Sequence, residues 1–352
     1  MKRTILLCLC GLTILLSAIT VSGQDIFKQE DNLFSTGELT TSAPLARGGH
    51  VVIKSASTLR GVLTITATSE KEARLKYFKQ AKTATKSRAI DYIDLIAVAL
   101  DKIPGGVQLE LRAPNPAPWG NDEAGTMTAD LAIPEGCDVE IDASYFDVNA
   151  VGPFRSISIP SSLGRLTVSN VTDKCELSTS NRRLTVTDIM GQIDVATTNS
   201  TLTATKINCG DNKAVFRNDG GDIKIDGLTG EANVKNSYGR IDLEDYHPAG
   251  NNNYIRSSNG PIMVYITKMD RGQLLLSNQY EDIDITIPET ISATLSLAVE
   301  EEGKIEVSNL PFKPEVIQQN RLNLVAGKGD ALINGSIRGK GNIYVRGSDE
   351  SD

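Results

Sequence analysis

The chain has 352 residues, with 44 acidic and 36 basic side chains and a formal net charge of −8. This negative charge, together with the lack of any Lys/Arg run, argues against nucleic acid as a partner, because phosphate backbones are bound by clustered positive charge. Two histidines and an aromatic content of 5% leave little material for a zinc site or for a broad sugar-stacking platform.

The first 23 residues have the pattern of a secretory signal peptide. Lys2 and Arg3 precede an apolar stretch, and small residues at 21–23 offer a cleavage point. The apolar stretch is short for a membrane span of about 20 residues, so we expect removal rather than anchoring. No later stretch is long enough to cross a bilayer. The mature chain, with 34 basic and 44 acidic residues, would carry about −10 charges and reside in the periplasm or on the cell surface.

Residues 24–130 predict an N-terminal region of strands with a helical insert. The polar residues from 24 to about 50 are expected to be partly disordered. Short strands are predicted near Val51–Lys54 and Gly61–Thr68. Ser69, followed by Glu72, fits a capping box, and the following residues predict a helical insert at about 69–102, ended by Pro104. Its second half carries an apolar stripe at helical spacing: Ile90, Ile93, Ala97 and Leu100.

Alternation resumes at Val107 and is interrupted by a Pro- and Gly-rich loop, Pro114–Thr126, which holds the only tryptophan, Trp119. Further strands are predicted at Leu131–Ile133 and Val139–Tyr145. Two strands end in the same Ile-Pro-Glu sequence, at 133–135 and 287–289. Proline removes a ladder donor, which suits the end of a strand.

From residue 131 to 347 the chain repeats a turn residue followed by an apolar-polar-apolar triplet, and 348–352 form an acidic tail. Alternation places every second side chain on one side of a strand, and such short strands bury their apolar side only when copies stack. The sequence therefore predicts a mainly β fold, a β-solenoid with coils of about 18–20 residues. The clearest copies are Gly164–Val168, Gly191–Val195, Gly221–Ile225, Gly239–Leu243, Gly303–Val307 and Gly341–Val345.

These repeats, the Ile-Pro-Glu strand ends and the EEGKIEVSNLP stretch at Glu301–Pro311 resemble the putative adhesin family of bacterial β-strand-repeat domains, a domain of unknown function. The resemblance covers about Leu131 to Val345 and implies an exported, elongated all-β domain. Several repeats, such as Arg182–Val186 and Glu281–Ile285, lack the leading glycine. The family has no established catalytic residues to transfer.

Three cysteines follow the signal peptide: Cys137, Cys175 and Cys209. The odd number leaves at least one thiol free or bonded between chains. Cys175 and Cys209 could pair across stacked turns in an oxidising compartment, or remain small buried thiols, and the sequence leaves both readings open.

No motif predicts a metal, a cofactor or a catalytic centre. Asn218–Gly227 resembles a calcium-binding repeat, but it occurs once, and Asp and Gly are ordinary turn residues. His50 and His247 have no Cys or His neighbours that would make a zinc site. The carboxylate pairs Asp222/Asp226 and Asp282/Asp284 occupy outward strand positions, where alternation already requires polar side chains.

We therefore expect an exported, non-enzymatic protein, adhesin-like or an envelope scaffold, with a glycan or protein partner. The alternative is a polysaccharide-acting enzyme that uses a solenoid groove. An enzyme would gather several ionisable groups in one cleft, whereas a scaffold would present scattered charge on a smooth sheet. The candidate contact residues are aromatic side chains near turns or loops: Trp119, Tyr238, Tyr246, Tyr254 and Tyr280.

Overall fold

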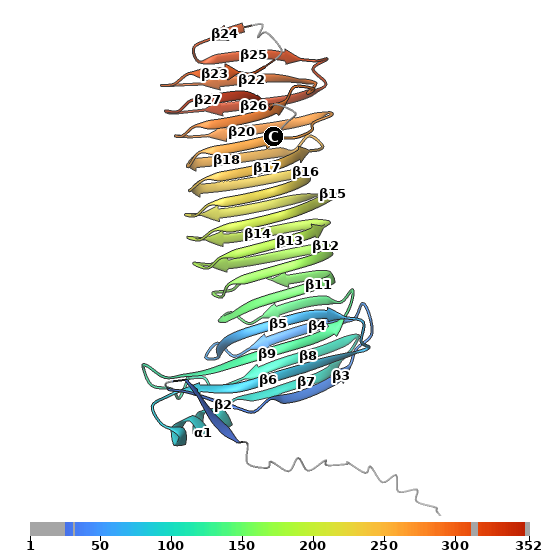
Figure 1. Cartoon of the computed structure of the whole chain (residues 1–352), viewed down its shortest axis with the longest axis vertical. Helices are drawn as coiled ribbons and strands as arrows, with labels where there is room; N and C mark the ends of the chain where they lie inside the picture. The colour runs from blue at the N-terminus through green and yellow to red at the C-terminus, as the bar shows by residue number, and fades with distance from the viewer. Residues whose placement is uncertain (1–24, 31, 311–315, 349–352) are drawn as a thin grey trace, which may run out of the picture.

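The structure is a computed structural model that describes residues 25–30, 32–310 and 316–348. These residues form 27 strands and one short helix, which confirms the prediction of a mainly β fold. The strands stack into a tall column that is broader at its N-terminal end (Figure 1). The predicted signal peptide, residues 1–23, lies outside the described residues, as does most of the predicted acidic tail.

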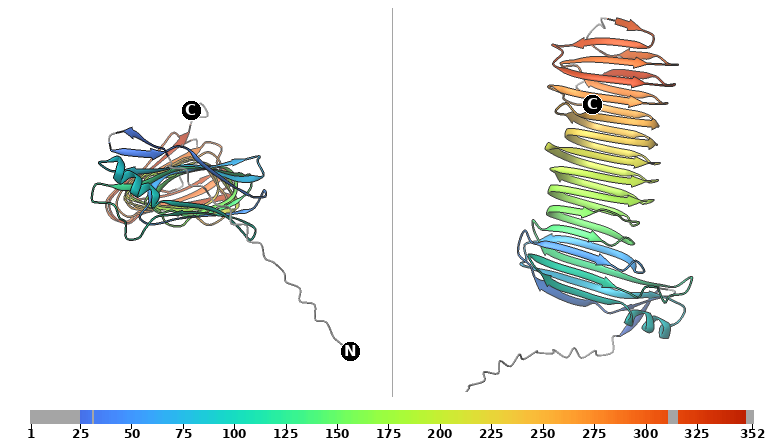
Figure 2. Two further views of the ribbon diagram at one scale, coloured as in Figure 1. Left: turned by 90° about the horizontal axis from the view of Figure 1, so that it is seen from below. Right: turned by 180° about the vertical axis from the view of Figure 1, so that it is seen from behind.

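All the strands belong to one hydrogen-bonded sheet, which wraps around the core as two faces (Figure 2). Four long strands pass from one face to the other and contribute to both: β11 (Phe146–Ile159), β12 (Leu166–Ser180), β15 (Leu202–Asp219) and β16 (Ile223–Tyr238). For example, Phe146–Val151 of β11 pairs with one neighbour, whereas residues 156–158 pair with another on the opposite face.

The first face contains the second halves of these four strands. Its other strands, from the N-terminal end of the column, are β7 (Ala97–Ile103), β8 (Gly106–Arg112), β4 (His50–Ser55), β10 (Asp138–Asp142), β14 (Gln192–Thr198), β18 (Asn253–Asn259), β20 (Gly272–Asn278), β26 (Ala331–Ile337), β22 (Ala293–Val299), β25 (Arg321–Ala326) and β24 (Val316–Gln318).

The second face contains the first halves of the four long strands. Its other strands are β1 (Ile26–Glu30), β2 (Leu33–Thr36), β3 (Leu39–Pro44), β6 (Glu72–Lys82), β9 (Ala124–Pro134), β5 (Arg60–Thr68), β13 (Leu184–Met190), β17 (Ile241–Pro248), β19 (Ile262–Ile266), β21 (Ile283–Pro288), β27 (Ile343–Ser348) and β23 (Ile305–Ser308).

Along the column the strands are parallel and in register. Leu184 pairs with Leu202 of the next coil, and Ile241 pairs with Ile262 in the same way. Ile193, midway between Leu184 and Leu202, lies on the opposite face, in the ladder with Cys175. One turn of the column therefore takes about 20 residues, as is usual for short repeats. Its length varies because some turns between strands carry extra residues.

Alternate side chains of each strand point inward, as the burial of Ile193, Val195 and Thr197 in β14 illustrates. Inward side chains at matching positions of successive strands, mostly Ile, Leu and Val, stack into one continuous apolar core that runs from Ala43 to Val345. Each buried side chain of this size contributes roughly 1.5–3 kcal/mol. The core explains why strands as short as β14 and β19 remain folded here.

Within the second face, five successive strands from β12 to β17 bend at one corner, and the residue at the bend has the same backbone conformation in each. Asn170, Asp188, Lys206, Gly227 and Asp245 have φ of 59°, 57°, 56°, 72° and 46°, and strand pairing skips each of them. Asn, Asp and Gly tolerate this left-handed conformation, whereas a long side chain such as Lys206 costs about 1–2 kcal/mol there. The corner explains the turn residues that interrupt the alternation.

A buried row of polar side chains, here called the polar ladder, follows the ends of the first-face strands. Thr179, Thr197, Asn218, Asn236 and Ser257 pair in succession. The hydroxyl of Thr197 donates to the carbonyl of Arg182 at 3.1 Å, and other rungs bond the matching turns. The ladder thus satisfies backbone groups that turn inward between the two faces.

Both ends of the column contain a coil placed out of chain order. At the N-terminal end, β4 lies between β8 and β10, and β5 lies between β9 and β11. At the other end, β26 lies between β20 and β22, and β27 lies between β21 and β23. Antiparallel strands then cover both ends: β6 and β7 at the base, and β25 at the top.

The predicted helical insert at 69–102 is wrong in extent. Residues 72–82 form β6, because Ala73 and Leu75 alternate into the core while the strand pairs with β3 and β9. The helix α1 spans only Lys86–Asp94, with Thr85 as its N-cap. Ala97 and Leu100 belong to β7. Helix α1 lies at the N-terminal end of the column (Figure 1).

The expectation of partial disorder from 24 to about 50 is also wrong for the described residues. Ile26 and Phe34 are buried against the helix, in a small apolar cluster with Ala89 and Ile93. Residues 39–44 form β3, which pairs with β6 along its whole length. Tertiary pairing therefore orders a stretch whose polar composition suggested otherwise.

Candidate functional site

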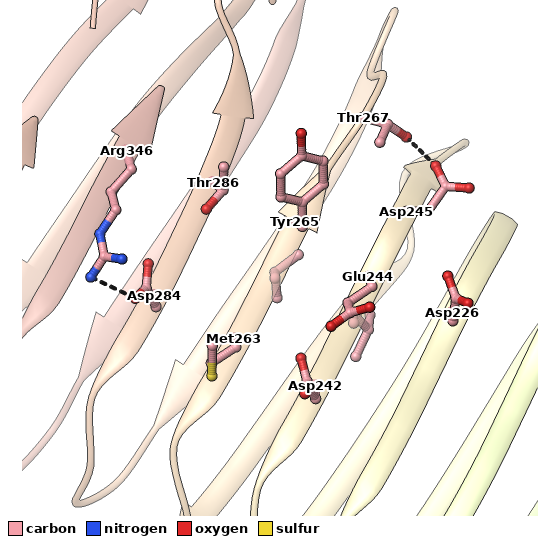
Figure 3. A pocket seen from close by; sticks show the side chains of 12 residues that line it. Asp226, Asp242, Glu244, Asp245, Met263, Tyr265, Thr267, Asp284, Thr286 and Arg346 are labelled. Atoms are coloured by element: carbon pink, nitrogen blue, oxygen red, sulfur yellow. Dashed lines mark hydrogen bonds and ion pairs between the residues drawn. The ribbon is translucent and has the colours of Figure 1, made fainter. Parts of the chain in front are cut away.

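A concave groove of about 510 Å³ lies on the outer side of the second face. Strands β16, β17, β19, β21 and β27 form its floor, and Figure 3 shows the lining side chains standing side by side on these neighbouring strands. The groove contains five carboxylates and one guanidinium: Asp226, Asp242, Glu244, Asp245, Asp284 and Arg346.

Strand register explains why these residues meet. Asp242 of β17 pairs with Met263 of β19, which pairs in turn with Asp284 of β21. In a parallel in-register stack, outward residues of successive coils stand about 4.8 Å apart, so each position becomes a row across the column. One row carries acidic groups at two levels with Met263 between them.

Asp284 is the most constrained of the groove carboxylates. Its Oδ2 lies 2.9 Å from Nη2 of Arg346, which reaches it from the neighbouring strand β27. Burial raises the pKa of Asp284 and the charge of Asp282 adds to this effect, while Arg346 opposes it. The net direction is upward, so desolvation outweighs the ion pair at this side chain.

The other carboxylates of the groove make fewer hydrogen bonds and ion pairs with the protein. Asp245 accepts a hydrogen bond from the Thr267 hydroxyl at 2.9 Å. Asp226, Asp242 and Glu244 make no ion pair or side-chain hydrogen bond within residues 25–30, 32–310 and 316–348. The groove therefore holds an excess of negative charge beside the exposed side of Met263 and the ring of Tyr265. The expectation of scattered charge on a smooth sheet is not met here.

The structure separates the candidate aromatic residues. Tyr238, Tyr254 and Tyr280 are 59%, 42% and 49% exposed, and the Lys213 ammonium lies 5.5 Å from the ring of Tyr254. Tyr246 is wrong as a contact residue, because it is fully buried and its hydroxyl donates to Oδ1 of Asn253 at 2.8 Å. The inward position of Tyr246 in β17 explains this: it follows the corner residue Asp245, which shifts the alternation.

Trp119 is half-buried and packs over the helix. Its ring meets Tyr92 of α1 edge-on at 5.4 Å, and its indole N–H donates to the carbonyl of Thr58 at 3.2 Å. These contacts hold Trp119 against the protein itself, over the helix, rather than presenting its ring to a partner.

The three cysteines are free and buried, and Cys175 and Cys209 form no disulfide. Burial raises the pKa of Cys175 to about 12, which makes it a poor nucleophile. Within the described part of the chain, no three His, Cys, Asp or Glu side chains are placed to hold a metal ion. In the calcium-like segment, Asn218 points inward and donates to the carbonyl of Ser200 at 2.7 Å, as a rung of the polar ladder.

Sequence reasoning considered Asp226 and Asp284 separately and missed Asp242, Glu244, Met263 and Arg346. The signal was present in the spacing, because Asp242, Met263 and Asp284 follow one another at equal intervals along the chain. Arg346 could not be found this way, since β27 joins the groove only through the out-of-order coil.

No family model and no curated protein matches this chain. Solved structures do match. A putative adhesin from Parabacteroides merdae has 8% identity and a TM-score of 0.35, over 88% of this chain and 95% of that one. A putative cell adhesion protein from Clostridium sporogenes has 10% identity and a TM-score of 0.22, over 89% and 100%. A putative lipid binding protein from Parabacteroides distasonis has 12% identity and a TM-score of 0.38, over 88% and 96%.

Proposed function

We propose that this chain is an exported, non-enzymatic interaction protein, an adhesin-like or envelope-scaffold module built as a β-solenoid. The observation that carries the proposal is the parallel, in-register stacking of successive coils. This stacking turns each outward position into a row across many strands, and repeat proteins bind through such extended surfaces. Among the described residues, no helix is long and apolar enough to span a membrane.

The acidic groove is the proposed contact surface on the second face. Asp242 and Glu244 lie there without ion-pair partners in the described residues, so they are available to a cationic group of a protein or glycan partner. The exposed Tyr238, Tyr254 and Tyr280 are proposed as additional contacts, because Tyr combines a large apolar face with a polar tip.

The test is capture of partners from an envelope extract on the immobilised full chain. The double variant Asp242→Asn/Glu244→Gln should lose the captured partner. The matched control is Glu140→Gln/Asp142→Asn, which changes the same residue types at the same spacing on β10 of the first face. Equal capture by both variants would remove the groove from the proposal. Protease treatment of intact cells would distinguish cell-surface from periplasmic residence.

A second function, polysaccharide hydrolysis, is favoured by one observation. Asp284 has a raised pKa and shares a groove with four other carboxylates, an arrangement that general-acid catalysis uses. The ion pair with Arg346 weighs against it, because a guanidinium stabilises the ionised carboxylate that can no longer donate a proton. Release of reducing ends from envelope polysaccharides, abolished by Asp284→Asn, would establish the enzyme instead.

A further inference from the structure

A second cavity, of about 470 Å³, has the opposite charge. It lies on the second face, beside the first residues of β5, β11, β12 and β13, and three arginines line it: Arg60, Arg165 and Arg182. Its remaining walls include Tyr145, Leu163 and Asp147. Three guanidinium groups and one carboxylate leave an excess of two positive charges, in a chain whose net charge is −8.

Stacking brings the three arginines together from separate coils. Arg60 begins β5, Arg165 precedes β12, and Arg182 precedes β13, and these strands lie in one parallel ladder with β11 between the first two. Gly164 lets the turn before β12 lie close against the start of β11, because a Cβ at Gly164 would lie 1.8 Å from the carbonyl oxygen of Phe146. The cavity is thus a product of register rather than of one flexible loop.

The guanidinium groups are not used by the protein itself. Two nearby arginines, Arg155 of β11 and Arg217 of β15, form ion pairs with Asp138 and Asp194. In contrast, Arg60, Arg165 and Arg182 make no ion pair or side-chain hydrogen bond within the described residues. Asp147 does not neutralise Arg165 directly, since its Oδ1 accepts from the Arg165 backbone N–H at 2.7 Å.

The cavity also offers an apolar surface. Tyr145 is 42% exposed and Leu163 is 43% exposed, and both lie beside the guanidinium groups. A planar guanidinium binds a carboxylate or sulfate through two parallel hydrogen bonds, and an aromatic ring packs against a sugar face. The combination fits a ring that carries an acidic group better than a free inorganic ion.

We propose that this arginine cavity binds acidic polysaccharide through its carboxylate or sulfate groups. The proposal rests on the interaction role proposed above, and it assigns one ligand class to a surface separate from the acidic groove. Three coils contribute one cationic side chain each, so successive levels of the column can contact successive parts of an extended chain.

The experiment is affinity electrophoresis of the full chain in gels that contain polygalacturonate, chondroitin sulfate or neutral dextran. We expect retardation by the acidic polymers only, and weaker retardation as salt increases. Each of Arg60→Gln, Arg165→Gln and Arg182→Gln should weaken binding about tenfold, since one charge-assisted pair is lost. The triple variant should not bind.

The matched control is Arg240→Gln. Arg240 occupies the equivalent turn before β17, and its backbone N–H likewise donates to an aspartate, Asp222, at 3.0 Å. It lines neither cavity, so this variant should bind like the unaltered chain. Equal losses at Arg240 and Arg165 would overturn the site, because charge alone would then explain binding.

Other results also decide the matter. A triple variant that still binds, or binding to anionic phosphatidylglycerol vesicles but to no glycan, would overturn the proposal. Failure to bind any acidic glycan while the envelope partner is still captured would end this inference and leave the proposed function intact. Unchanged circular dichroism and melting temperature of the variants would exclude misfolding as the cause.

Discussion

Asn236, a rung of the polar ladder, gives the sharpest test of how the column is held together. Its side chain is 1% exposed, and Nδ2 donates to the carbonyls of Gly221 and Gly239 at 2.8 and 3.1 Å. Asn236→Ala would leave these buried carbonyls without a partner. At about 1 kcal/mol for each lost bond, plus a small cavity, the free energy of unfolding should fall by about 2–3 kcal/mol.

The ladder itself supplies the comparison variant. Threonine occupies the rung at Thr197, where its hydroxyl bonds a turn carbonyl, so Asn236→Thr should retain one bond and lose less stability than alanine. Threonine also removes Oδ1 of Asn236, which is buried and has no partner in the described residues. The control is Asn259→Ala, in which an exposed asparagine loses a single bond of 3.3 Å to Ser237.

Urea unfolding followed by far-UV circular dichroism would measure all three variants. We expect Asn259→Ala to cost less than about 0.5 kcal/mol, as is usual for surface changes. If Asn236→Ala costs no more than Asn259→Ala, the ladder does not stabilise the turns and the reasoning fails.

Three further predictions concern the corner, the groove and the thiols. Lys206→Gly should stabilise the fold by about 1 kcal/mol in urea unfolding, because glycine relieves the left-handed backbone, whereas Lys224→Gly, in a regular strand, should destabilise it. The pKa of Asp284, followed by carboxyl-carbon NMR, should rise further in Arg346→Gln and fall in Asp282→Asn. Because this pKa is raised in the folded state, the contribution of Asp284 to stability should be full below the ordinary value of 3.8 and be lost as pH rises through the folded-state value. Cys175, with a pKa of about 12, should resist iodoacetamide at pH 8 in the native chain and react after unfolding, as read by mass spectrometry; opposite results would contradict each argument.

The repeated part of the fold could be predicted because each strand carries its own signal. Ile193, for example, follows closely on a glycine and alternates with polar neighbours, and its place midway between Leu184 and Leu202 matches the passage to the opposite face. Local alternation and global stacking agree at such positions, so the sequence pattern is sufficient.

The base of the column could not be predicted in the same way. Residues 72–82 contain charged and helix-favouring side chains, and only pairing with β3 and β9 makes them a strand. The two cavities could not be predicted from the sequence either, because each depends on which coils become neighbours in the fold. Arg346 reaches Asp284 from a strand much later in the chain, and no periodicity indicates this contact.

The coil formed by β26 and β27 has a consequence for how the molecule is assembled. Its strands come after β22 and β23 in the chain, yet they separate these strands from β20 and β21. Strands β22 and β23 therefore lack their parallel partners until residues 331–348 have been made and inserted. A chain halted before that point would present two unfinished strand edges, which are open to pairing with other molecules. The C-terminal end of the column can therefore form only after β26 and β27 have been inserted. We expect its strands to be the last to become resistant to proteases during refolding.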